Sequence, residues 1–83
     1  MITHKQLIKH NFVIETATHT SPFYLHGKVN GVLSGGVFHF PMVNEWYQAK
    51  NIGHLKYLYK KVTGEKLEVM EDSKYNLITS LLN

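Results

Sequence analysis

Six histidines among 83 residues are the side chains best suited to metal binding or acid–base chemistry in this sequence. His26 and His39 fall on neighbouring predicted strands, where facing Cβ atoms lie about 5 Å apart, close enough to share a metal ion. A third ligand would have to be His19 or Glu15. No ligand pair has the close spacing of a zinc motif such as H-E-x-x-H. We therefore predict no metal and no other cofactor, and interpret the histidines as ordinary surface or half-buried imidazoles.

Side chains for covalent or carboxylate catalysis form no recognisable motif. The sequence has no cysteine, and Ser34 lacks the G-x-S-x-G setting of an activated serine. The carboxylates from Glu65 to Asp72 crowd a predicted strand and a helix start, where a solvated edge and the helix dipole explain them. The sequence thus predicts a protein that is not an enzyme.

Two groups of side chains are candidates for contact with a partner. Lys56, Lys60 and Lys61 lie off the apolar stripe of a predicted helix, and lysines attract an acidic protein surface or a phosphate backbone. Trp46 and Tyr47 lie in the least regular stretch, where an aromatic pair either caps the core or anchors an interface. We predict these five residues as the partner-binding set, with a solvated helix face as the alternative.

A second candidate site lies on the polar face of the predicted sheet. An aromatic group beside cationic groups is what stacking on a base and neutralising a phosphate require. The glycine-rich Ser34–Gly36 lies beside this face, but it lacks the lysine and the following helix of a P-loop and is typical of a hairpin turn. The alternative hypothesis is a small-molecule binder that sequesters a nucleotide-like ligand through Tyr24, His26, Lys28 and His39.

The net charge of +3 is unevenly distributed along the chain. Residues 1–64 carry seven lysines against Glu15 and Glu45, a net charge of +5, whereas residues 65–83 carry four carboxylates against Lys66 and Lys74, a net charge of −2. Every basic residue is lysine, so the planar fork with which arginine reads guanine is missing. Sequence-specific nucleic-acid recognition is therefore disfavoured, and non-specific nucleic-acid binding is the weaker alternative function.

Length and composition indicate one domain, residues 1–83, because halves of this size could not build separate cores. A chain this short buries only about 60–65% of its unfolded surface. Association into a homo-oligomer would bury more surface and stabilise the fold. The absence of cysteine fits a reducing compartment. No secretory signal and no window of about 18 apolar residues is found. We predict a cytoplasmic protein that does not enter a membrane.

Three helices are predicted from their capping residues. Thr3-His4-Lys5-Gln6 has the form of a capping box for a short helix over residues 4–10, with Asn11 as a left-handed stop. Asn51 caps a central helix that ends at Gly64, and its apolar residues form one stripe: Ile52, Leu55, Leu58, Tyr59 and Val62. Asp72 or Ser73 begins a final helix that carries Leu77, Ile78, Leu81 and Leu82.

The predicted strands cover residues 12–19, 23–29, 37–40 and 65–69, with a turn at Thr20-Ser21-Pro22. Alternation over residues 23–29 predicts that Phe23, Leu25 and Val29 face the core and that Tyr24, His26 and Lys28 face water. Either Asn30–Gly31 or Ser34–Gly36 reverses the central hairpin, and residues 41–50 could be an edge strand, a helical turn or a loop. We expect an α+β fold: a three-stranded antiparallel meander plus a short fourth strand, with the central helix on one face and short terminal helices.

The segment from Asn51 to Val69 resembles a segment of short uncharacterised proteins of Bacteroidetes and their phages, with the form H-x-L-x-x-L-Y-x-x-x-T-G-x-x-L. Those proteins also open with a short helix ending in Gly-Phe, similar to Asn11–Phe12 here. The sequence departs from the pattern at Gly53, where the family has histidine. The resemblance implies a phage or mobile-element setting and no catalytic activity. By analogy with small phage proteins, we expect stoichiometric association with a protein partner, as an inhibitor of machinery in the host cytoplasm.

Overall fold

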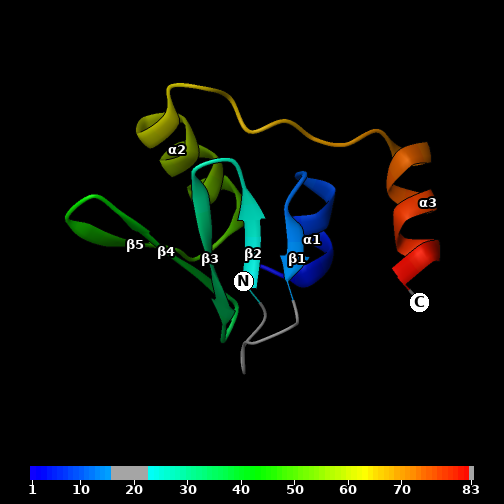
Figure 1. Ribbon diagram of the computed structural model, residues 1–83, viewed down its shortest axis with the longest axis horizontal. Helices are drawn as coiled ribbons and strands as arrows, with labels where there is room; N and C mark the ends of the chain where they lie inside the picture. Colours follow the sequence, from blue (N-terminus) through cyan, green and yellow to red (C-terminus); the bar gives the residue numbers. More distant parts are fainter. Residues whose placement is uncertain (16–22, 83) are drawn as a thin grey trace.

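Antiparallel strands, each paired with the next along the chain, form the centre of the protein (Figure 1). The computed structural model describes residues 1–15 and 23–82. Within these residues the sheet has five strands in the order β1-β2-β3-β4-β5, which is an uninterrupted meander. The strands are β1 (Val13–Glu15), β2 (Phe23–His26), β3 (Val29–Ser34), β4 (Val37–Met42) and β5 (Glu45–Ala49). The helices are α1 (His4–Lys9), α2 (Ile52–Thr63) and α3 (Asp72–Leu82).

The α+β class and the antiparallel sheet agree with the sequence prediction, but the number and bounds of the strands do not. The predicted strand over residues 23–29 is interrupted by a two-residue turn at Gly27 and Lys28, where Gly27 has a φ of +59°. Asn30 and Gly31 lie inside β3, and Gly35–Gly36 makes the next reversal. The open stretch 41–50 contains an edge strand, β5. The end of the predicted first strand, the predicted turn after it and His19 all fall within residues 16–22. These residues lie outside the described part of the chain.

The predicted fourth strand at residues 65–69 is wrong, because this segment pairs with no strand of the described chain and instead crosses α1. The backbone N–H of Met70 donates to the carbonyl of Lys9 at 2.7 Å, and the Asn11 side chain donates to the carbonyl of Glu68 at 3.0 Å. Leu67 is buried and Val69 is 51% exposed. Burial therefore does not alternate as it would on a strand: Leu67 and Met70 are buried with two exposed residues between them, and the segment is a linker that lies along the core.

The helix caps agree with the sequence prediction. The amide of Gln6 donates to the Thr3 hydroxyl at 3.2 Å, and the Gln6 side chain accepts from the Thr3 amide at 3.0 Å, which completes the capping box. The Asn51 side chain accepts from the amide of His54 at 2.8 Å, and Gly64 ends α2 in the left-handed conformation. Asn11 also has a positive φ of 71°. These signals are local, so the sequence alone carries them.

The core lies between the sheet and the helices α1 and α2, and it is rich in aromatic rings. Phe38 is at its centre, with ring centroids 5.3 Å from Phe12, 6.4 Å from Tyr24 and 5.8 Å from Phe40. The apolar stripe of α2 is buried in the same cluster, as predicted, through Leu55, Leu58 and Tyr59. Packing of this stripe on an antiparallel sheet fixes which groups of α2 face outward.

The two faces of β2 are the reverse of those predicted. Tyr24 is fully buried, whereas Phe23 and Leu25 are half-buried on the opposite face. The reason is the two-residue turn at 27–28: His26 pairs directly with Val29, so these two residues point to the same side. Because Val29 is buried, His26 and Tyr24, which share its face of the sheet, also point toward the core. The prediction treated residues 23–29 as one continuous strand, and it therefore placed Tyr24 and His26 on the wrong face of the sheet.

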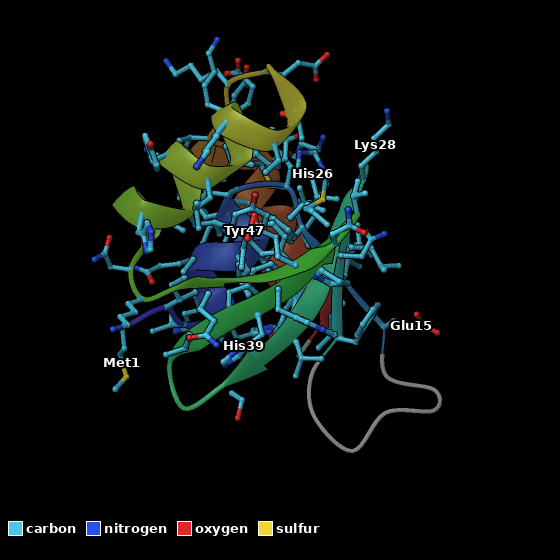
Figure 2. The ribbon with its side chains drawn as sticks, turned by 90° about the vertical axis from the view of Figure 1, so that its left-hand side faces the viewer. Met1, Glu15, His26, Lys28, His39 and Tyr47 are labelled. Carbon is cyan, nitrogen blue, oxygen red and sulfur yellow. The ribbon has the colours of Figure 1, made fainter. Side chains whose placement is uncertain are left out.

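The face of the sheet turned away from α1 and α2 is called the open face (Figure 2). By the strand register it carries Val13, Phe23, Leu25, Val32, His39 and Trp46. Val13 is 63% exposed and Trp46 is 64% exposed. These two residues lie on the two opposite edge strands, β1 and β5, so they are separate exposed apolar groups and do not form one patch.

Candidate functional site

The β4–β5 hairpin projects at one end of the molecule, opposite α3 (Figure 1). It carries two residues of the predicted partner-binding set, Trp46 and Tyr47, which point to opposite faces because they are consecutive in β5. Trp46 lies on the open face. Tyr47 stacks on Phe40, with ring centroids 5.5 Å apart, and its hydroxyl donates to the Glu45 carboxylate at 3.2 Å. Tyr47 thus extends the core, and Trp46 is the exposed aromatic group.

A groove between this hairpin and α2 brings Tyr47 together with Lys61. Its volume is about 350 Å³, and its walls also include Val43, Glu45 and Val62. Lys56 and Lys60 are exposed and four residues apart, so they share another flank of α2. The structure therefore brings Tyr47 and Lys61 together in this groove, places Trp46 on the opposite face of the same hairpin, and leaves Lys56 and Lys60 as a separate basic flank.

Sequence reasoning did not identify Val43 at the tip of the hairpin. Its side chain is 98% exposed, and its backbone has a φ of +33°, which is strained for a β-branched residue. Strain of this kind costs of order 1–3 kcal/mol and concentrates at functional positions. The turn residue Asn44 was the only sequence signal for a reversal here. We call Val43, Glu45, Trp46, Tyr47 and Lys61 the hairpin surface.

The four residues of the alternative ligand site do not share one wet face. The buried hydroxyl of Tyr24 shares a hydrogen bond with Nδ1 of His4 at 2.5 Å, and burial raises the pKa of Tyr24. The His26 ring stacks on Tyr59 with centroids 5.4 Å apart. Lys28 is exposed in the β2–β3 turn, and His39 lies at the other end of the sheet (Figure 2). The predicted polar face, which motivated the nucleotide hypothesis, is therefore wrong.

The geometry also separates the two histidines considered for a metal. His26 pairs with Val29 and His39 pairs with Val32. Since these two valines are three residues apart in one strand, the histidines point to opposite faces of the sheet and cannot share an ion. Across residues 1–15 and 23–82, no three potential ligands are grouped for metal binding.

Replacing His26 with glutamine is expected to reduce the loss of stability between pH 7 and pH 5. Burial lowers the pKa of His26 below its ordinary value of 6.5, and Glu65 opposes this more weakly. Below about pH 6.5 the unfolded state then binds more protons than the folded state, so the free energy of unfolding decreases as the pH falls. At higher pH both states are neutral and His26 makes no difference. Urea unfolding at pH 7.5, 6.5, 5.5 and 5.0 measures the slope.

The matched control for this prediction is His54→Gln, at an exposed position on α2. It removes an exposed imidazole, so it controls for the loss of a histidine without the loss of a buried one. A His26→Gln slope equal to the wild-type slope would show that His26 protonates equally in both states.

Comparison with known proteins gives no assignment of family. No protein-family model matches the sequence, and neither a curated protein nor a solved structure matches it. Within the described chain, none of the helices combines the length and apolar character needed to cross a bilayer.

Proposed function

We propose that the protein acts by stoichiometric binding of a protein partner at the hairpin surface. The observation that carries the proposal is the pair of large apolar side chains, Val43 and Trp46, held out from the fold on a projecting hairpin at 98% and 64% exposure. Tryptophan is enriched among residues that dominate binding energy. Nothing in the proposal requires catalysis or a cofactor.

An acidic partner fits this surface best. Lys61 lines the groove beside Tyr47, and Lys56 and Lys60 extend a positive field along α2. Only one carboxylate, that of Glu45, belongs to the hairpin surface, and it accepts from Tyr47. Clustered lysines raise association rates with acidic surfaces more than they raise affinity. In this proposal Val43 and Trp46 provide most of the binding affinity, and the lysines increase the rate of association with the acidic partner.

The resemblance to short phage and Bacteroidetes proteins supports a phage or mobile-element setting for this proposal. In that setting, a small protein that acts by occupancy alone would work as an inhibitor of host machinery. A photo-crosslinking amino acid placed at Val43 would capture the partner from a Bacteroidetes lysate. Native mass spectrometry of the purified pair then gives the stoichiometry, for which we expect one copy of each chain.

Trp46→Ala is expected to weaken binding of the captured partner by at least roughly 30-fold, because loss of a central tryptophan typically removes 2 kcal/mol or more. Isothermal titration calorimetry measures the effect. Leu77→Ala is the matched control, since Leu77 is 63% exposed but lies on α3 at the other end of the molecule. Equal affinity of the Trp46 variant and the wild type, or equal losses in both variants, would contradict the proposal.

A further inference from the structure

An apolar groove of about 320 Å³ lies between β1 and α3, at the end of the molecule away from the hairpin surface (Figure 1). Three buried side chains, those of Ile8, Phe12 and Met70, form its floor. The half-buried Ile14 of β1 and Ile78 of α3 form its walls. The enclosed part of the groove is therefore lined by side chains that favour hydrocarbon over water.

Lys74 carries the only charge among the described residues that line the groove. It is exposed and lies one helical turn before Ile78 on the same side of α3, which places its ammonium at the rim. Within the described chain Lys74 makes no ion pair, whereas the neighbouring Asp72 is neutralised by Lys9. The groove thus combines an apolar floor with one unpaired cation at its mouth.

The scarcity of polar groups limits the ligands that this groove could hold. Besides Lys74, the polar side chain in the described lining is that of Asn11, whose N–H already donates to the carbonyl of Glu68 at 3.0 Å. A sugar, a nucleotide or a peptide would lose hydrogen bonds to water that these walls do not replace. A hydrocarbon chain with one anionic end loses none, because its charged end stays at the exposed rim.

Contacts around Lys9 fix the position of the α3 wall. The carbonyl of Lys9 accepts from the amide of Met70 at 2.7 Å. Its ammonium pairs with Asp72 and lies 4.9 Å from the centre of the Tyr75 ring. These contacts form the groove before any ligand arrives, and a preformed site lowers the entropic cost of binding.

We propose that this groove binds a small monocarboxylate with an unbranched alkyl chain, of the class of a medium-chain fatty acid. At roughly 30 Å³ for each non-hydrogen atom, the share that one water takes in the liquid, the groove holds about ten such atoms, the size of octanoate. The chain lies on the floor at Ile8, Phe12 and Met70, and the carboxylate pairs with Lys74. The site is separate from the hairpin surface and does not depend on the protein partner proposed above.

Titration of the ¹⁵N-labelled protein with sodium octanoate, followed by nuclear magnetic resonance, tests this proposal. We expect saturable shifts at Val13, Ile14, Lys74 and Ile78, with a Kd of about 1 mM or tighter for a ligand of this size. Hexanoate should bind roughly fifteenfold more weakly than octanoate, because each buried methylene contributes about fourfold. The four extra methylenes of dodecanoate should add less than about tenfold in total, because the groove is then full.

Replacement of the rim cation tests the head group. Lys74→Gln should weaken octanoate by roughly threefold to fivefold, the effect of an ion pair at an exposed site, and should leave the binding of neutral octan-1-ol unchanged. Lys66→Gln, which removes an exposed lysine outside the groove, should bind octanoate as tightly as the wild type. Trp46→Ala should also bind it unchanged, which separates this site from the hairpin surface.

Three results would overturn the proposal: no saturation at 10 mM octanoate, a concentration about tenfold above the expected Kd, shifts confined to other elements, or equal affinity for hexanoate and octanoate. Equal affinity of Lys74→Gln and the wild type for octanoate would overturn the assignment of an anionic ligand. Shifts at the same groove residues on raising the protein concentration without octanoate would assign the groove to a second copy of the chain, and would also overturn it.

Discussion

Replacing Gly31 with alanine is expected to destabilise the folded protein by at least about 3 kcal/mol, at the upper end of the cost of overpacking. Gly31 lies inside β3, where an added Cβ would be 2.0 Å from the carbonyl oxygen of His39 and 2.8 Å from Cβ of Phe40. Both atoms belong to β4 or to the root of its side chains, so a change of rotamer cannot relieve the clash. The two strands would have to separate at the centre of the sheet.

Chemical denaturation followed by far-ultraviolet circular dichroism measures this loss. A domain of this size has a total stability of roughly 5–10 kcal/mol, so the variant should unfold at a much lower urea concentration or fail to fold. Gly27→Ala is the control. It has no atom within 4 Å of the added Cβ and meets only the strain of a φ of +59°, for which we expect about 1 kcal/mol. Equal losses in the two variants would show that the close approach of β3 and β4 is not what requires glycine.

Phe38→Ala is the second change with a large expected effect, a loss of about 3–5 kcal/mol. Phe38 is fully buried and its ring contacts those of Phe12, Tyr24 and Phe40. Removal of the ring leaves a cavity lined by groups on the sheet and on the segment after α1. Tyr24 and Phe40 cannot move far because the strand ladders hold them, and the amide of Phe12 donates to the carbonyl of Leu7 at 3.0 Å.

Trp46→Ala serves as the control for Phe38→Ala, because it removes a larger aromatic group from the same hairpin. Since Trp46 is 64% exposed, its loss should change the free energy of unfolding by less than about 1 kcal/mol. Urea unfolding of both variants beside the wild type gives the comparison. A Phe38→Ala protein as stable as Trp46→Ala would contradict the assignment of the aromatic cluster as the core.

The sequence predicted the features that depend on near neighbours in the chain. The capping box at Thr3–Gln6, the left-handed Asn11 and the helix between Asn51 and Gly64 are each set by side chains within four residues of the bonds they make. The apolar stripe of α2 could be predicted for the same reason, since its residues recur at helical spacing along a short segment. Of the two candidate turns, Gly35–Gly36 is the one in the structure, where both glycines have positive φ.

The features that could not be predicted from the sequence depend on where the strands change direction. The turn at Gly27–Lys28 contains one glycine and follows a regular alternation, so nothing local distinguished it from a continuing strand. That one turn reversed the assigned faces of Tyr24 and His26 and removed the basis of the ligand site. Of the partner-binding set, the sequence could identify Trp46 as a candidate. The exposure of Val43 and the groove shared by Tyr47 and Lys61 depend on tertiary structure.

The contacts of Lys9 link α1 to the segment that leads into α3, 63 residues further along the chain. During synthesis α1 leaves the ribosome early, but its cation, its last carbonyl and the neighbouring Asn11 have no partners until residues 68–75 have been made. The fold is therefore closed late, by the arrival of α3. A chain that ends before Glu68 would therefore leave the ammonium and the carbonyl of Lys9, and the side chain of Asn11, without these partners.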